Sequence, residues 1–216
     1  MIIKNLGLVD YQATFCAMKD FTDKRDQNTP DEIWICEHKS VFTQGLAGKA
    51  EHILHKSDIP IIPTDRGGQV TYHGPGQLII YPLLNLKARP DHLNPIGIRA
   101  LVSLLEQATL DLLKEYNIDA YTQALAPGIY VDNSLGIGQK IASLGLRVRK
   151  NCSYHGIAIN INCDLSPFDL INPCGYVGLK MINLATCLAL NKNLTQNISL
   201  DLLGKQYLKY FLGNLS

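Results

Sequence analysis

Apolar positions in the first third of the chain follow first a strand pattern and then a helical one. Residues Ile2–Val9 suit a β-strand, and Glu32–Cys36 predicts a second strand. Between them, Asp10 is placed to cap a helix over Tyr11–Arg25, because an Asp side chain accepts hydrogen bonds from the free N–H groups of a first turn. One face of this helix carries apolar residues at three- and four-residue steps, which predicts packing against the core: Tyr11, Phe15, Met18 and Phe21 or Thr22.

The middle of the chain alternates irregular and strongly periodic segments. Val41–Leu54 is polar and contains glycine with little period, so we expect a loop at an active site, and Ile59–Pro63 predicts a short extended piece. A helix is expected to begin at Asn94-Pro95, a cap residue followed by a proline in the first turn, and to run to about Tyr116. We assign this helix a scaffold role only. Its apolar stripe recurs at helical steps: Ile98, Leu101, Leu105, Ala108, Leu112 and Tyr116.

The last third predicts several strands and a final helix, which together set the fold class. The expected elements are a strand at Ile129–Val131, a turn at Asp132–Gly136, strands at Lys140–Val148 and Ser153–Ile161 joined near Lys150-Asn151, a strand or short helix at Met181–Thr186, and a helix over Leu200–Phe211 capped by Ser199. Strands outnumber helices, and hairpins alternate with long helices. This favours an α/β protein of the α+β type, with a mixed β-sheet flanked by helices. Without repeats or linkers, residues 1–216 are expected to form one domain.

Composition and charge narrow the classes of function. The net charge of +1 indicates no long-range field for nucleic acid or a membrane surface, and no apolar run approaches the ~20 residues of a membrane span. The chain shows no signal peptide, so we expect a cytoplasmic protein with reduced thiols. His52 and His55 lack a further ligand nearby in sequence, which argues against zinc, and we expect no cofactor. The cysteines other than Cys174 lie in apolar or strand-like segments, so we expect them to be packing residues: Cys16, Cys36, Cys152, Cys163 and Cys187.

A glycine-rich stretch, Arg66–Gln77, is the most distinctive feature of the sequence. It runs RGGQVTYHGPGQ and leads into the apolar segment LIIYPLL. Glycine permits close approach to the backbone, and such a run is more typical of a site than of a plain connector. Its pattern predicts a glycine turn, a short strand, a second turn and a buried strand. On local chemistry alone, a binding site and a tight hairpin with an incidental Arg and His are equal alternatives.

With four further blocks, this stretch resembles the lipoyl(octanoyl) transferase family. Those blocks are VFTQG followed by GKAEHIL in residues 41–54, KIASLGLR in 140–147, YHGIAIN in 154–160 and INPCG in 171–175. Together they span most of the chain, and several ordered blocks are far more specific than one glycine run. The resemblance implies the fold of the biotin and lipoate protein ligase catalytic domains. It also implies transfer of an octanoyl group from octanoyl-acyl carrier protein to a lysine of lipoyl domains, in 2-oxoacid dehydrogenase complexes and the glycine cleavage carrier protein.

The resemblance also implies which residues react. By that match Cys174 is the nucleophile and Lys140 its acid/base partner. A covalent intermediate splits a transfer between two large proteins into two steps, and a neighbouring ammonium stabilises the reactive thiolate. On local pattern alone, Cys174 is equally a cysteine in an ordinary Asn-Pro turn, and a lysine such as Lys140 is usually solvated.

Other residues are implied to bind substrate. Small residues in adjacent strands, Ser143-Leu144-Gly145 and Gly156-Ile157-Ala158, can leave a groove for a straight acyl chain or simply allow close strand packing, and the resemblance favours the groove. His73 is either part of the site or a satisfied structural histidine, and His155 is expected to support the site residues or to be structural rather than to be catalytic. The glycine stretch contributes the remaining predicted site residues: Arg66, Gly67, Gly68, Gln69, Val70, Thr71, Tyr72 and His73.

Two other functions compete with acyl transfer. An ATP-dependent lipoate or biotin ligase of the same fold would form an acyl-adenylate and would not need Cys174. A non-catalytic protein that binds a lipoyl domain or a carrier protein would retain the fold without turnover. Dependence on ATP and on Cys174 discriminates among the three.

Overall fold

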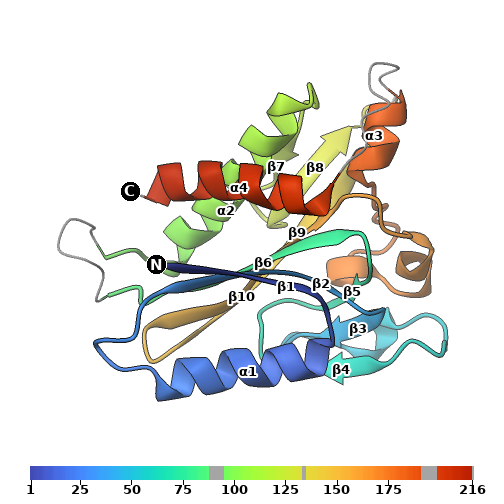
Figure 1. Cartoon of the computed structure of the whole chain (residues 1–216). Helices are drawn as coiled ribbons and strands as arrows, with labels where there is room; N and C mark the ends of the chain where they lie inside the picture. Colours follow the sequence, from blue (N-terminus) through green and yellow to red (C-terminus); the bar gives the residue numbers. More distant parts are fainter. Residues whose placement is uncertain (88–94, 133–134, 191–198, 216) are drawn as a thin grey trace.

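Two β-sheets and four α-helices make up the computed structural model, which describes residues 1–87, 95–132, 135–190 and 199–215. Helix α1 covers one face of the larger sheet, and α2 and α4 cover the other (Figure 1). The smaller sheet lies beside the end of α1. The predicted mixed sheet flanked by helices is therefore confirmed.

The larger sheet has seven strands. β1 and β2 are parallel, and every other pair is antiparallel. The two central strands consist entirely of buried residues, because helices cover both faces of the sheet there. The strands follow in space as β1 (Ile2–Val9), β2 (Glu32–His38), β6 (Gln77–Leu83), β10 (Cys152–Asn160), β9 (Gly138–Arg149), β8 (Gly128–Asp132) and β7 (Tyr121–Thr122).

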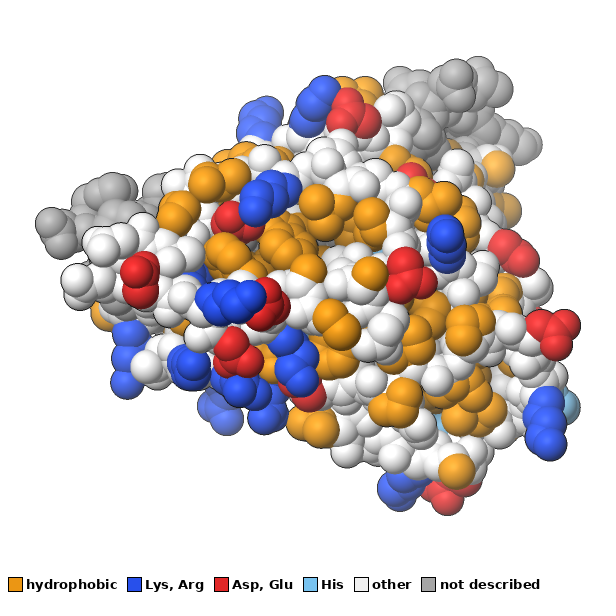
Figure 2. All heavy atoms as spheres, turned by 60° about the horizontal axis from the view of Figure 1, so that its bottom comes forward, with side chains coloured by type: hydrophobic (Ala, Val, Ile, Leu, Met, Phe, Trp, Pro, Cys, Tyr) orange, Lys and Arg blue, Asp and Glu red, His pale blue; other side chains and the backbone are white. Residues whose placement is uncertain are grey.

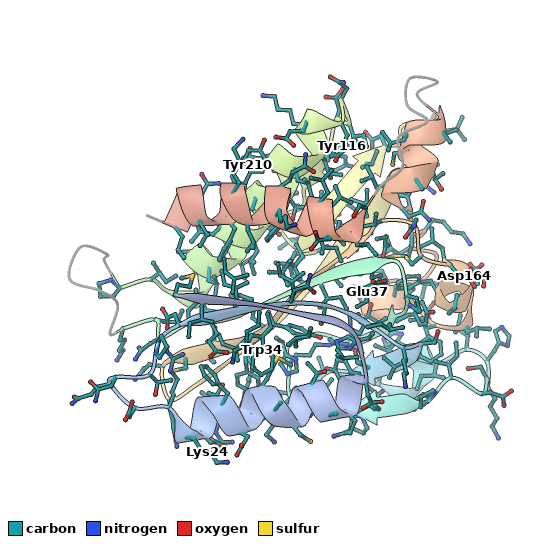
Figure 3. The ribbon with its side chains drawn as sticks, viewed as in Figure 1. Lys24, Trp34, Glu37, Tyr116, Asp164 and Tyr210 are labelled. Carbon is teal, nitrogen blue, oxygen red and sulfur yellow. The ribbon has the colours of Figure 1, made fainter. Side chains whose placement is uncertain are left out.

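The helices bury the apolar stripes that the sequence predicts. Asp10 caps α1 (Tyr11–Lys24) by accepting a hydrogen bond from the Ala13 N–H at 2.9 Å. The side chain of Trp34 lies between the sheet and α1, whereas Tyr116 and Tyr210 lie among the helices of the opposite face (Figure 3). That face holds the larger core. It is covered by α2 (Ile98–Glu115), α4 (Leu200–Leu215) and the short α3 (Leu184–Leu190).

The smaller sheet has three strands in the order β4 (Ile61–Pro63), β3 (Val41–Gln44) and β5 (Val70–His73). Short 3₁₀ helices in the described part of the chain accompany the two sheets: η1 (Ala50–His52), η2 (Ser166–Leu170) and η3 (Pro173–Gly175). A separate apolar cluster packs beneath this sheet and joins it to η2. The arrangement carries the glycine-rich stretch and η3 to the same place.

Several expectations need correction. Val41–Leu54 is not a loop throughout, because its first residues pair as β3 and its end forms η1. Helix α2 begins at Ile98, with Gly97 at its cap, rather than at Pro95. Cys16 is exposed, because it lies off the buried stripe of α1. Met181 makes one bridge to Lys140, and α3 begins three residues later. The predicted cap Asn94 and the turn residues 133–134 lie outside the described residues.

Charged side chains are mixed on the face that carries α1. Figure 2 shows basic and acidic groups side by side there. Asp23 forms ion pairs with both Arg149 and Lys150. The paired charges fit the net charge of +1. None of the described helices has the length and apolar character needed to span a bilayer.

Candidate functional site

A lysine and a cysteine from distant parts of the chain meet beside the glycine-rich stretch. The Lys140 Nζ lies 3.4 Å from the Cys174 Sγ. Lys140 is 1% exposed, whereas Cys174 is half-buried. An ammonium that lacks bulk water is retained in a fold only where a partner compensates for lost hydration, and the thiol supplies that partner here.

Backbone pairing fixes Lys140 relative to the segment that carries Cys174. Lys140 lies in β9, where its N–H donates to the Lys180 carbonyl at 2.9 Å. Its own carbonyl accepts from the Ile182 N–H at 3.0 Å. These two bonds tie the strand to the chain that follows η3, so the two reactive groups belong to one hydrogen-bonded unit.

Cys174 occupies a strained turn. Its φ is +57°, in the left-handed region that few residues other than glycine adopt. The turn is closed by a hydrogen bond from the Gly175 N–H to the Asn172 carbonyl at 3.0 Å, and the Asn172 N–H donates to the His52 carbonyl at 2.8 Å. Strain of this kind persists where the surrounding structure fixes it, and it often marks a functional position.

Electrostatics favour the charged form of Lys140. Burial alone lowers the pKa of this lysine, but its attraction to Cys174 and Tyr130 more than offsets burial, so the net shift is upward. The Lys140 Nζ lies 5.2 Å from the centre of the Tyr130 ring. The site therefore holds an ammonium next to a cysteine thiol.

Arg66 anchors the glycine-rich stretch beside this pair. Its guanidinium donates to the Thr43 carbonyl at 2.7 Å and to the Thr43 hydroxyl at 2.8 Å. The next residue, Gly67, donates its N–H to the Leu146 carbonyl of β9 at 3.1 Å. Burial lowers the pKa of Arg66, and nearby acidic groups, Cys174 among them, oppose this shift. The stretch is thus fastened to both sheets.

A cavity of about 430 Å³ extends from the Lys140–Cys174 pair. Its volume lies in the range of small-molecule sites in proteins. Residues of the paired strands β9 and β10 line it, together with residues of α1, α2 and the loop before β8. Twelve residues predicted from the sequence line it with Lys140 and Cys174: Arg66, Gly67, Gly68, Gln69, Thr71, His73, Ser143, Leu144, Gly145, Gly156, Ile157 and Ala158.

Two predicted residues lie elsewhere. Val70 and Tyr72 do not line the cavity but pack in the apolar cluster of the smaller sheet. Side chains alternate along a strand, so Thr71 and His73 reach the cavity while their neighbours in β5 face away from it. The alternation along β5 could have been predicted from its sequence, but we predicted the whole glycine-rich stretch as one binding segment.

The cavity also has walls that the sequence did not indicate. Ile98 and Val102 bring α2 to the cavity, so this helix is more than a scaffold. Tyr11 of α1 and Tyr81 of β6 also line it, as does Tyr176 just after η3. Helical periodicity marks such residues as buried, but it does not distinguish a side chain in the core from one at a cavity wall.

Buried histidines form one polar end of the cavity. The His73 Nδ1 donates to the Gln77 Oε1 at 3.1 Å, and its ring stacks on Tyr11 with 5.7 Å between ring centres. Burial lowers the pKa of His73 well below its usual range. His155, at a φ of +57°, lies 3.1 Å from the Asp65 carboxylate, and burial lowers its pKa as well. Both rings are therefore neutral near pH 7.

A metal site does not emerge from the described residues, where no three His, Cys, Asp or Glu side chains come together as ligands. All six cysteines are free thiols. Burial raises the pKa of four of them, to about 11 for Cys187 and about 12 for Cys163. Those four thiols are poor nucleophiles, because the thiolate is the reactive form.

Comparisons with known proteins agree in family and fold. Residues 10–212 match the family model of the lipoyl protein ligase A/B catalytic domain. A curated relative named octanoyltransferase, from Saccharophagus degradans, is 60% identical over 182 residues, which cover 84% of this chain and 80% of the relative. Another of the same name, from Shewanella amazonensis, is 56% identical over 83% of this chain and 79% of its own length.

Solved structures share the fold at low identity. A lipoate-protein ligase A bound with ATP superposes with a TM-score of 0.74 at 15% identity, covering 99% of this chain and 84% of that one. The biotin protein ligase of Aquifex aeolicus superposes with a TM-score of 0.55 at 13% identity, covering 100% of this chain and 69% of the other. At such identities the likeness concerns architecture alone.

Proposed function

Because the chain belongs to the octanoyltransferases of the lipoyl protein ligase A/B catalytic domain family and is an acyltransferase, we propose that it transfers octanoyl groups through a thioester on Cys174. The observation that carries this proposal is the 3.4 Å separation between the Lys140 Nζ and the Cys174 Sγ at a cavity. Two reactive groups from segments 34 residues apart meet there.

The first half-reaction loads the enzyme. The Cys174 thiolate attacks the carbonyl carbon of the octanoyl thioester on the acyl carrier protein. A new C–S bond forms, the bond to the carrier sulfur breaks, and the Lys140 ammonium gives its proton to the departing carrier thiolate. One thioester replaces another, so this step is close to thermoneutral.

The second half-reaction delivers the acyl group. The neutral amine of a lipoyl-domain lysine attacks the Cys174 thioester. An amide bond forms, Cys174 leaves as a thiolate, and neutral Lys140 takes the proton that the attacking nitrogen loses. The thiolate and ammonium are regenerated together, so a single lysine serves as acid in one step and base in the next.

The cavity is the proposed binding site for the octanoyl chain. Ser143, Gly145 and Ala158 line it with little side-chain volume, while Leu144 and Ile157 give it apolar walls. An apolar chain leaves water on entering such a site, and each buried methylene contributes about 0.8 kcal/mol. The acceptors proposed are lipoyl domains of 2-oxoacid dehydrogenase complexes and the glycine cleavage carrier protein.

ATP-dependent ligation is the alternative that the fold permits. The ligases with solved structures share the architecture at 13–15% identity, whereas the relatives at 56–60% identity are named octanoyltransferases. An acyl-adenylate mechanism also has no use for a half-buried cysteine 3.4 Å from a buried ammonium. Transfer from a carrier thioester without ATP is therefore the better account.

Removal of the proposed nucleophile tests this function. Cys174→Ala should abolish octanoyl transfer to a lipoyl domain and retain the fold, because the side chain is half-buried and its turn is closed by backbone bonds. Cys16→Ala is the matched control, since the Cys16 thiol is exposed on α1. Transfer by Cys174→Ala near the wild-type rate would overturn the nucleophile assignment.

A further inference from the structure

An irregularity in β8 sets an aromatic ring opposite the reactive lysine. The pairing of β8 with β9 runs from Ile129↔Ala142 to Tyr130↔Lys140 and skips Ile141. Without that shift, Tyr130 would pair with Ile141, and its ring and the Lys140 side chain would lie on opposite faces of the sheet. Bulges of this kind are common next to active sites, where they redirect a side chain.

We propose that Tyr130 is a positioning residue, whose ring face holds the Lys140 ammonium beside Cys174. The proposal rests on the acyl-transfer function above and names a residue that acts through Lys140 rather than on the substrate. The Lys140 Nζ lies 5.2 Å from the ring centre, within the ~6 Å over which an aromatic face attracts a cation.

The ring itself is held firmly. Tyr130 is 2% exposed, and its hydroxyl donates to the Ala126 carbonyl at 2.8 Å. Its other ring contact is with Tyr121, at 6.0 Å between ring centres. A fixed ring under a four-carbon side chain limits the rotamers open to Lys140, so the ammonium is kept where the thiolate needs it.

The electrostatic surroundings of Lys140 also place its ammonium beside Tyr130. Burial raises the pKa of the Tyr130 hydroxyl and Lys140 lowers it, so the ammonium also lies near that hydroxyl, which the Phe variant below separates from the ring. A desolvated cation gains more from an aromatic face than a hydrated one does, and Lys140 is 1% exposed. Titratable groups on the elements packed around Lys140 include Cys174 in η3, Tyr176 just after it, Glu106 of α2 and Arg66 of the glycine-rich stretch.

The experiment measures the alkylation of Cys174 by iodoacetamide as a function of pH, by peptide mass spectrometry. The exposed Cys16 thiol in the same molecule is the internal reference. Tyr130→Leu and Tyr130→Met remove the ring, and Tyr130→Phe restores it without the hydroxyl. Thermal unfolding establishes that each variant is folded, and the Met variant serves if the Leu variant does not fold.

We expect the Leu and Met variants to shift the midpoint of the Cys174 profile upward by about half to one and a half pH units. An ammonium that is no longer held beside Cys174 stabilises the thiolate less, so the rate of acyl-enzyme formation at pH 7 should fall roughly 3- to 30-fold. Tyr130→Phe should follow the wild-type profile. If Phe shifts as far as Leu, or if neither Leu nor Met shifts, Tyr130 does not act through its ring face.

Failure of the underlying function gives a different result. If wild-type Cys174 is alkylated no faster than Cys16 at pH 6, and Lys140→Ala leaves its profile unchanged, the lysine does not activate the cysteine at all. That outcome overturns the Lys140–Cys174 pair of the proposed function and, with it, the role of Tyr130. If wild-type Cys174 is activated by Lys140 but the Tyr130 variants keep the same pH profile of Cys174 alkylation, only the role of Tyr130 is overturned.

Discussion

A single methyl group added at Gly128 should displace the reactive lysine. The Cβ of an alanine there would lie 2.3 Å from the Lys140 Cε and 3.0 Å from its Nζ. It would also lie 2.6 Å from the Ala142 carbonyl oxygen, which belongs to the backbone of β9. Gly128 cannot retreat freely, because its N–H donates to the Glu106 carboxylate at 3.0 Å.

The size of the effect follows from these contacts. Ordinary van der Waals contact begins at 3.4 Å, so the Lys140 Cε would have to move by about 1 Å. A misplacement of that size at a catalytic group lowers rates by up to roughly 100-fold. The φ of +138° adds backbone strain of about 1–3 kcal/mol for alanine. For a chain of this length, 2 kcal/mol lowers the melting temperature by roughly 4–8 °C.

The assay measures octanoyl transfer from the carrier protein to a lipoyl domain, alongside thermal unfolding. Gly136→Ala is the matched control, because Gly136 has a φ of +71° but none of the described residues places an atom within 4 Å of an added Cβ. It should lose about 1–2 kcal/mol of stability with an unchanged rate. If Gly128→Ala transfers octanoyl within twofold of wild type, Lys140 does not need its observed position and the dyad is wrong.

Three further predictions follow from the same structure. Lys140→Ala should slow both half-reactions roughly 10- to 1,000-fold at pH 7, with partial recovery at alkaline pH where more thiolate forms without help; single-turnover rates of each half-reaction against pH check this. His38 is neutral in the fold because burial lowers its pKa from 6.5 to about 4, so the unfolded chain binds the proton first on acidification. The free energy of unfolding should then fall by about 3 kcal/mol between pH 6.5 and pH 4, and urea titrations of His38→Gln should show a shallower pH dependence. Ala158→Leu fills part of the cavity, so kcat/KM should fall at least 10-fold for octanoyl donors and less for butanoyl donors; equal losses for both donors would place the acyl chain elsewhere.

Periodicity predicts most of the framework of this protein. The stripe of α1, the cap at Asp10 and the two long strands β9 and β10 follow from local residue order, because apolar residues recur at helical steps in α1 and β-branched and other apolar residues are frequent in the two strands. The start of α2 does not follow from it. Asn94-Pro95 carries the chemistry of a helix start, yet the helix begins at Ile98, since propensity is weak against tertiary packing.

The site is less accessible to sequence reasoning. Local chemistry left Cys174 equal to a cysteine in a plain turn, and only a family resemblance singled it out with Lys140. Contacts between distant segments depend on strand register. The residues around Tyr130 do not distinguish a strand with this register shift from a regular one. The prediction that Cys16 is a buried packing residue was wrong for a related reason, since one side of its helix faces the core and the other is exposed.

The most direct test of the central claim is an intact-protein mass spectrum taken after mixing the enzyme with octanoyl-carrier protein in the absence of ATP. The account predicts an octanoyl adduct that maps to Cys174 and disappears when a lipoyl domain is added. An enzyme that shows no adduct, and modifies the lipoyl domain only when ATP and free octanoate are supplied, would contradict the acyl-enzyme route and favour ligation.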